Sequence, residues 1–270
     1  MSSTDLETIT STGILHTWPN TYTMTKAMTE HLLVKYHGDI PLVIVRPSIV
    51  GSAYTEPVPG WVDVISAAGA VYVAIGLGVL RYLEGSTQNV GDIIPVDYVA
   101  NTIFVASSII YNKKKQHFIC HSASSSENPM CWGYPMDHVV EYFADHKPTR
   151  ALQKATFSFQ TTQLYQIKFF LEYSIPSAIL NTIALTGNSQ YKQKAQLFQK
   201  LLWQVRVISE AFKYFTINQW CFDNRNVRSC YSMLTPEDQE LFPLRLSTLD
   251  WFQYSELFSY GLCKYTLKMP

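Results

Sequence analysis

Tyr22 and Lys26 are the two side chains whose types and spacing best fit a chemical role in this sequence. On a helix, residues four apart share one face. An ammonium group beside a phenol favours the phenolate, and such a tyrosine can move a proton to or from a carbonyl oxygen while hydride is transferred at the carbon. The lysine can also hold the ribose of a nicotinamide cofactor. The pair is therefore a candidate proton-transfer site.

The spacing alone is weak evidence. Chance would produce about one such pair in a chain with this many tyrosines and lysines, and the sequence contains three, the others being Tyr111/Lys115 and Tyr260/Lys264. A surface lysine beside a packed tyrosine explains the bare spacing more simply. Only the first pair precedes an apolar strand that ends in Arg-Pro-Ser, and this context selects it.

Other chemistry is less well supported. On a strand, His117 and His121 share a face while Cys120 lies on the opposite one. No third ligand stands at a suitable spacing, so a metal site is not expected. The sequence has no G-x-S-x-G elbow for a serine nucleophile, and the pair Gly76 and Gly78 lacks the third glycine of a dinucleotide fingerprint.

A helix and a strand would position the candidate pair. Pro19 and Asn20 can open a helix over 19–36. Its apolar side would be formed by Tyr22, Met24, Ala27, Met28, Leu32 and Leu33. Residues 42–50 then open with a β-branched run typical of a buried parallel strand, punctuated by Pro47 and Gly51. A helix followed by a buried strand is one crossover unit of a doubly wound sheet, and the loop 56–60 would lie at its ligand-binding carboxyl edge.

The segment 64–80 contains no charged residue. It is near the lower length limit of a membrane-spanning helix, but a buried loop or helix of a globular domain is the favoured interpretation. Further along, the patterns predict a strand at 92–96, a helix at 99–110, a strand at 117–121 and a linker or long surface loop at 122–150.

After residue 150 the pattern becomes helical. Apolar residues recur at helical spacing over 196–217: Leu197, Leu201, Leu202, Val205, Ile208, Phe212 and Phe215. Basic residues accompany them, so this helix could lie on a membrane surface. Packing against the rest of the protein is favoured, because most amphipathic helices face a core.

Composition narrows the class of protein. The 270 residues are 47% hydrophobic and only 16% charged, with 21 basic and 21 acidic residues. A disordered chain is excluded, nothing points to nucleic acid, and an apolar ligand is favoured. Five cysteines without a CxxC pair fit a reducing compartment. The polar, acidic residues 1–12 do not resemble a secretory signal, so a cytosol-facing protein is expected.

Several motifs occur together in one order. Residues 18–30 read WPNTYTMTKAMTE, and they are followed by IVRPSIV at 44–50, EPVPGWVD at 56–63 and DIIPVD at 92–97. The second half contains SIPS at 174–177, WCFDN at 220–224, LDW at 249–251 and GLCKY at 261–265. Together these stretches resemble the alcohol-forming fatty acyl-CoA reductases, which are extended short-chain dehydrogenase relatives with a C-terminal "male sterility" domain.

The resemblance implies a fold and a reaction. The expected fold is α/β: the C-terminal part of a Rossmann-like doubly wound parallel sheet in a partial NAD(P)-binding domain over 1–150, then a mainly helical domain over 151–270. The implied reaction reduces long-chain fatty acyl-CoA to a fatty alcohol through an aldehyde, with NADPH as cofactor.

The resemblance also implies roles for individual residues. Tyr22 would donate the proton to the carbonyl oxygen, and Lys26 would favour its phenolate and bind the cofactor ribose. The stretch expected against the nicotinamide consists of Arg46, Pro47, Ser48, Ile49 and Val50. Gly60 and Trp61 are expected near the acyl thioester.

The sequence also departs from the family pattern. The glycine-rich phosphate loop and the serine that partners the tyrosine would lie before Met1, so we expect an N-terminally truncated form that is inactive alone. One alternative is a short isoform without catalysis that binds acyl groups or membranes. Another, a sterol or sugar-nucleotide dehydrogenase relative, is disfavoured by the C-terminal motifs. The family implies a membrane surface as partner, at the endoplasmic reticulum or the peroxisome.

Overall fold

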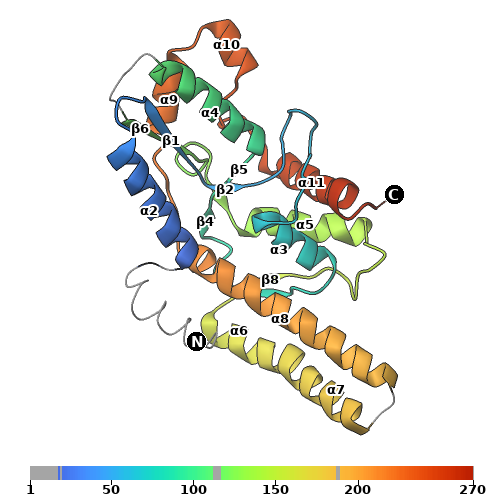
Figure 1. Cartoon of the computed structure of the whole chain (residues 1–270). Helices are drawn as coiled ribbons and strands as arrows, with labels where there is room; N and C mark the ends of the chain where they lie inside the picture. The colour runs from blue at the N-terminus through green and yellow to red at the C-terminus, as the bar shows by residue number, and fades with distance from the viewer. Residues whose placement is uncertain (1–17, 19, 112–116, 187–188, 270) are drawn as a thin grey trace.

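The computed structural model describes residues 18, 20–111, 117–186 and 189–269. The polar start of the chain, Pro19 and Lys115 lie outside this range. Strands and helices together form the upper body in Figure 1, and helices of the second half of the chain extend below it.

The helix that carries the candidate pair is α2, Thr21–Tyr36. Asn20 caps its first turn, since the Asn20 side chain accepts a hydrogen bond from the Thr23 amide at 2.9 Å. The predicted helix is thereby confirmed, but its packing is not, because no residue of α2 is buried. The helix packs against a narrow two-stranded sheet, so that Met28 and Leu32 stay half exposed.

In the described part of the chain, short strands form four pairs, three of them parallel. The parallel pairs are β1 (Leu42–Pro47) with β6 (His117–Ser122), β2 (Ile49–Val50) with β5 (Ile93–Ile94), and β3 (Tyr82–Glu84) with β8 (Ser158–Gln160). The antiparallel pair is β4 (Val90–Gly91) with β7 (Met130–Cys131). The expected parallel α/β architecture and the strands near 42, 92 and 117 are thus confirmed. Within β1, however, only Ile44 is buried.

The uncharged segment 64–80 contains a core helix. Helix α3, Ala67–Gly76, buries eight of its ten residues, which confirms the favoured interpretation of this segment. Within the described part of the chain, no helix has both the length and the apolar character needed to cross a membrane. Helix α4, Val96–Ile110, begins three residues earlier than predicted, directly after Pro95.

The predicted linker at 122–150 is wrong. This segment contains β7 and helix α5, Gly133–Asp145, which buries Met136, Val139 and Phe143. The Phe143 ring packs so closely on Gly76 of α3 that a Cβ there would come within 2.5 Å of it. The Ser, Asn and Pro residues at the start of the segment favour a loop, whereas the apolar residues that follow them recur at helical spacing.

The second half is mainly helical, as predicted, with β8 as the exception. Its helices are α6 (Thr162–Phe169), the π-helix η2 (Phe170–Ser174), α7 (Ile175–Thr186), α8 (Ser189–Ile217), α9 (Arg225–Ser232), α10 (Pro236–Leu241), α11 (Trp251–Gly261) and the π-helix η3 (Leu262–Thr266). Residues 162–217, here called the helical arm, extend from the body so that α7 lies at its outer edge (Figure 1). Helix α8 packs on the core through Val205, Ile208 and Phe212, which supports the favoured interpretation of this helix, although Leu197 is exposed.

One core crosses the predicted domain boundary at residue 150. It joins Val71 and Tyr72 of α3 to Tyr254 and Phe258 of α11. A smaller cluster packs Cys120 of β6 and residues of α4 against α9. The division into two domains remains a prediction, because the packing is continuous across it.

Candidate active site

Tyr22 and Lys26 share one face at the start of α2. The Lys26 Nζ atom lies 5.7 Å from the centroid of the Tyr22 ring. Tyr22 is 66% exposed, so its hydroxyl is accessible to a ligand. The predicted pairing is confirmed, and the roles of the two side chains remain predictions.

The side chains of Tyr260 and Lys264 lie closer together than those of the candidate pair, because Lys264 Nζ is 5.1 Å from the centroid of the Tyr260 ring. Lys264 Nζ donates a hydrogen bond to the Tyr260 hydroxyl at 2.7 Å, and this contact raises the pKa of Lys264. Geometry alone therefore does not select the site. The distinction lies in position, because α2 leads into β1 whereas Tyr260 is near the end of α11.

Arg46 connects α2 to β6 at the end of β1. Its Nε donates to Glu30 at 2.9 Å, and the hydrogen bond to Glu30 raises the pKa of Arg46. Its Nη1 lies 3.3 Å from His121 Nε2, while His121 Nδ1 lies 3.1 Å from the Asp223 carbonyl oxygen. The guanidinium thus holds two elements together. Its expected contact with nicotinamide remains a prediction.

At the carboxyl end of β1, successive backbone amides within residues 47–50 donate hydrogen bonds to two different segments of the chain. The Ser48 amide donates to the Ser122 carbonyl at 3.0 Å, and the Ile49 amide donates to that of Asp92 at 3.1 Å. The Ser48 hydroxyl is buried without a hydrogen-bond partner among the described residues. An unsatisfied hydroxyl at this edge fits a polar ligand, which is the position expected for the nicotinamide half of a cofactor.

Asp97 holds the loop that follows β2. Its buried carboxylate accepts hydrogen bonds from the amides of Tyr54, Thr55 and Glu56 at 2.8 to 3.2 Å, and from the Thr55 hydroxyl at 3.1 Å. Sequence reasoning quoted this residue only within a motif. The available signal was an acidic residue in the first turn of a helix next to the predicted carboxyl edge.

Gly60 is enclosed by α11. Its φ is +76°, and a Cβ there would lie 2.6 Å from the Leu257 carbonyl oxygen. A Cβ on Gly261 would lie 1.6 Å from the Gly60 carbonyl oxygen. The neighbouring Trp61 donates its amide to Val58 at 3.0 Å and is 37% exposed. The structure thus gives Gly60 a packing role, and the expected proximity of both residues to the thioester remains a prediction.

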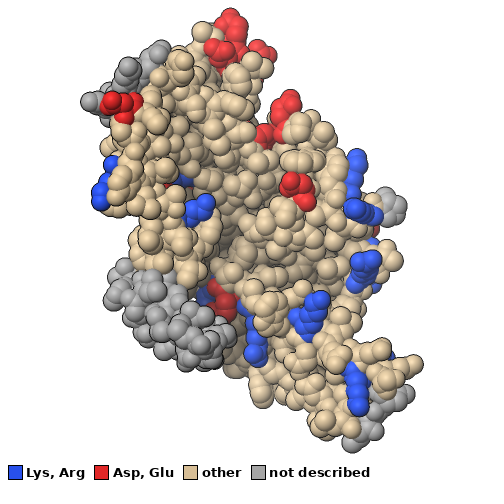
Figure 2. All heavy atoms as spheres, viewed as in Figure 1, with Lys and Arg blue, Asp and Glu red and all other residues tan. Residues whose placement is uncertain are grey.

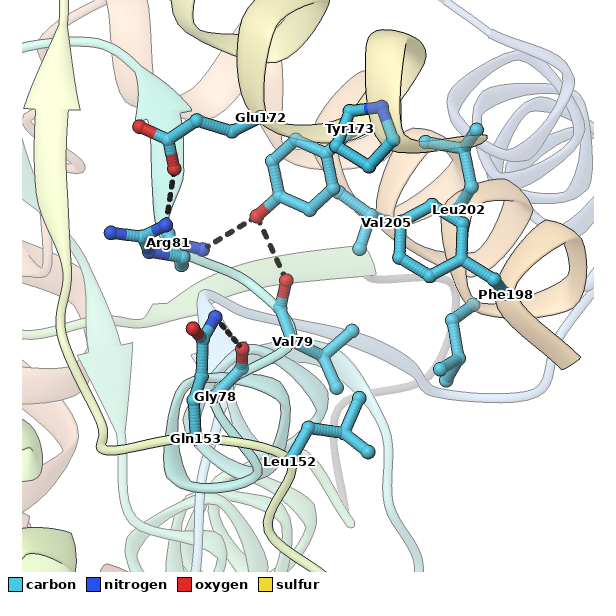
Figure 3. Close-up of a pocket in the computed structure, with 12 residues that line it drawn as sticks. Gly78, Val79, Arg81, Leu152, Gln153, Glu172, Tyr173, Phe198, Leu202 and Val205 are labelled. Atoms are coloured by element: carbon cyan, nitrogen blue, oxygen red, sulfur yellow. Dashed lines mark hydrogen bonds and ion pairs between the residues drawn. The ribbon is translucent and has the colours of Figure 1, made fainter. Parts of the chain in front are cut away.

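A cavity of about 260 Å³ lies where the helical arm meets the body (Figure 3). Its apolar wall includes Leu152, Phe198, Leu202 and Val205. None of the site residues predicted from the sequence lines it.

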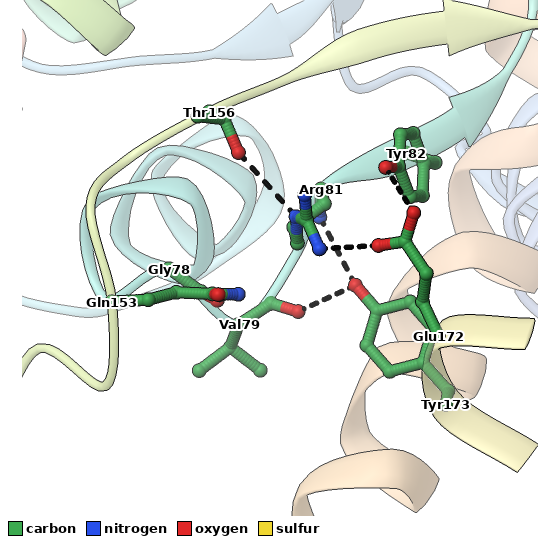
Figure 4. Close-up of polar contacts among 8 residues, drawn as sticks. All are labelled: Gly78, Val79, Arg81, Tyr82, Gln153, Thr156, Glu172 and Tyr173. Atoms are coloured by element: carbon green, nitrogen blue, oxygen red, sulfur yellow. Dashed lines mark hydrogen bonds and ion pairs between the residues drawn. The ribbon is translucent and has the colours of Figure 1, made fainter. Parts of the chain in front are cut away.

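The polar end of this cavity is a closed network (Figure 4). Arg81 pairs with Glu172, and the Tyr173 hydroxyl donates to the Val79 carbonyl at 2.9 Å while accepting from the Arg81 amide at 3.3 Å. Burial raises the pKa of Tyr173 to about 12, so this phenol is neutral at physiological pH. The cavity can hold an apolar group, because its polar groups are already paired.

Within the described ranges, the structure shows no cluster of side chains that could support metal chemistry. No three His, Cys, Asp or Glu side chains come together there in a way that could hold a metal ion.

Comparison with known proteins gives two family matches. Residues 2–103 match an NAD-binding family described as "male sterility protein", and residues 172–269 match a second family with the same description.

Curated relatives align over nearly the whole chain. It is 31% identical to fatty acyl-CoA reductase 1 of Xenopus laevis, over 92% of the chain and 48% of the relative. It is 32% identical to the fatty acyl-CoA reductase wat of Drosophila melanogaster, over 97% of the chain and 50% of the relative. It is 33% identical to fatty acyl-CoA reductase 2 of Mus musculus, over 93% of the chain and 48% of the relative. The chain therefore spans about half the length of the curated relatives it matches.

Proposed function

Because the chain belongs to the fatty acyl-CoA reductase family, we propose that it takes part in the NADPH-dependent reduction of long-chain fatty acyl-CoA to a fatty alcohol through an aldehyde. The observation that carries the proposal is the exposed Tyr22–Lys26 pair on the helix that leads into β1. An NAD(P)-binding family match over the same region supports the choice of a nicotinamide cofactor.

In this mechanism Tyr22 donates a proton to the carbonyl oxygen as negative charge develops on it. Lys26 favours the phenolate that remains and binds the cofactor ribose. NADPH, when bound, supplies the hydrides. The segment 46–50 would lie along the nicotinamide, where the unsatisfied Ser48 hydroxyl offers a hydrogen bond.

The sequence contains no glycine-rich phosphate loop. Pyrophosphate binding normally uses such a loop at a helix N-terminus. We therefore expect these 270 residues alone to reduce acyl-CoA slowly or not at all. Activity would require a segment of the kind that the longer relatives carry.

The test uses a chimera in which these residues replace the aligned residues of mouse fatty acyl-CoA reductase 2. We expect NADPH oxidation and alcohol formation with palmitoyl-CoA, and a loss of roughly 10² to 10⁴ in kcat for Tyr22→Phe. Tyr260→Phe is the matched control, because its lysine stands at the same spacing. Unchanged turnover in Tyr22→Phe, or an equal loss in the control, would contradict the role of Tyr22.

A second candidate is binding without catalysis at a membrane. The exposed apolar residues of the helical arm favour it, and in this case the chain would bind acyl-CoA or lipid without oxidising NADPH. For both candidates we propose a location on the cytosolic side of the endoplasmic reticulum or peroxisomal membrane. Imaging of a tagged chain against markers of both organelles tests this location.

A further inference from the structure

Helices α6, η2 and α7 carry a row of exposed apolar side chains. Leu164, Ile167, Leu171, Ile175 and Ile179 are each 37% to 54% exposed. They follow one another at intervals of three or four residues, which places them along one side of a helix. We call these five residues the outer stripe.

A π-helical turn keeps the outer stripe straight. Intervals of four residues drift around an α-helix by roughly 40° each, because a turn takes 3.6 residues. The π-helix η2 lies in the middle of the row. Its wider turn rotates the chain less per residue and so opposes this drift. The five side chains therefore stay on one side from α6 into α7.

The outer stripe is free of charge. Between residues 162 and 191 the only charged residues are Lys168 and Glu172, and both turn toward the body. Lys168 Nζ lies 4.5 Å from the centroid of the Tyr82 ring. Glu172 accepts a hydrogen bond from the Tyr82 hydroxyl at 2.7 Å and pairs with Arg81.

Helix α8 packs against α7 and supplies exposed cations. These are Lys192, Lys194, Lys200 and Arg206, and within the described ranges none of them forms an ion pair. Figure 2 shows blue atoms over this part of the molecule, while red atoms gather at the far end around α10. The arm thus combines an uncharged apolar stripe with exposed cations on the neighbouring helix α8.

This combination fits an anionic lipid surface better than a second copy of the chain. A two-fold contact between arms would bring the same cations opposite one another. A membrane instead offers hydrocarbon to the stripe and phosphates to the lysines. The exposed aromatic residues Tyr191 and Trp203 of α8 suit the boundary between the two.

We infer that the helical arm docks on an anionic membrane surface through the outer stripe and the basic residues of α8. The inference gives a surface to the membrane association proposed above. Its test needs neither NADPH nor acyl-CoA, so its failure would leave the proposed reduction in place. The Tyr22→Phe variant should bind vesicles as the unaltered chain does.

The experiment is flotation of the 270-residue chain with vesicles of phosphatidylcholine, alone or mixed with phosphatidylserine. We expect binding to the mixed vesicles that weakens with added salt. Replacing Lys192, Lys194 and Lys200 by Gln should weaken it on the order of fivefold per lysine. The triple variant Leu171→Gln, Ile175→Gln and Ile179→Gln should weaken binding to the mixed vesicles at least about tenfold.

The matched control makes the same kind of change elsewhere. Ile103, Met233 and Leu241 are exposed apolar residues outside the arm, and their replacement by Gln should leave binding unchanged. Circular dichroism confirms that each variant is folded. Absence of vesicle binding by the unaltered chain, or equal losses in the stripe and control variants, would overturn the inference. Sedimentation showing a dimer that the stripe variant converts to a monomer would overturn it in favour of a second copy.

Discussion

Thr55 gives both its amide and its hydroxyl to the carboxylate of Asp97, at 2.8 and 3.1 Å. The amides of Tyr54 and Glu56 bind the same group. One buried side chain at the start of α4 therefore fixes the loop at the carboxyl edge of the β2–β5 pair, which is the edge where open α/β sheets bind their ligands.

Replacing Asp97 should loosen this loop before it affects the rest of the fold. Asp97→Ala leaves three amides without their acceptor and should lower the free energy of unfolding by about 3 kcal/mol. Asp97→Asn keeps one oxygen acceptor and should cost roughly half as much. Urea unfolding measures the loss, and hydrogen exchange should show faster exchange at residues 54–56. Slow exchange there in Asp97→Ala would contradict this role.

A second prediction concerns the close packing of Gly51 on Tyr254. A Cβ on Gly51 would lie 2.2 Å from the Tyr254 hydroxyl oxygen, which donates to the Ser52 carbonyl at 3.0 Å. Gly51→Ala should therefore destabilise the fold by about 2 kcal/mol, and Tyr254→Phe by about 1 kcal/mol.

The double variant distinguishes this clash from a general effect. Removing the hydroxyl makes room for the new methyl group, so Gly51→Ala with Tyr254→Phe should cost less than the sum of the two single changes. Thermal unfolding of all four proteins gives the coupling. Simple additivity would show that the clash is relieved in another way.

The third prediction concerns the ion pair between Glu84 and Lys213, which joins β3 to α8. Lys213 Nζ lies 2.9 Å from Glu84 Oε1, and the Glu84 side chain is only 6% exposed. Lys213→Met strands this carboxylate and should cost roughly 2 kcal/mol, less than for a fully buried pair because the lysine is partly solvated. Lys200→Met, on the same helix, should change stability by less than about 0.5 kcal/mol.

The pH dependence of this pair has a definite sign. The hydrogen bond to Glu84 raises the pKa of Lys213 above its usual 10.5. The stabilisation is therefore complete below pH 10.5 and declines as the pH rises through the folded-state pKa. The difference in unfolding free energy between the unaltered chain and Lys213→Met should shrink over that range. A constant difference would show that the lysine acts through packing alone.

Local patterns predicted the elements around the candidate pair well. The Asn20 cap and the β-branched run at 42–45 act over a few residues, so α2 and β1 could be predicted from the sequence. The pairing of β3 with β8 could not, because each strand has only three residues and the two are far apart in the chain. Helix α5 did not follow from composition, because the Ser, Asn and Pro residues that precede it are typical of a loop.

The site was less predictable than the fold. Tyr22/Lys26 and Tyr260/Lys264 have the same spacing, and their different positions emerge only from the packing of α2 and α11. The contacts of Asp97 depend on a loop more than 40 residues earlier in the chain. Apolar periodicity in the helical arm also cannot say which side a helix buries, so the outer stripe became visible only in the structure.

The contact between Gly60 and Gly261 limits how the two halves of such a protein can diverge. At 1.6 Å, a methyl group on one backbone would occupy the space of the other, so neither surface can change there independently. The two regions that match separate families of the same description approach each other through their backbones at this point. A recombined protein would keep this fit only if residue 261 stayed glycine, so the two regions share a constraint at this point.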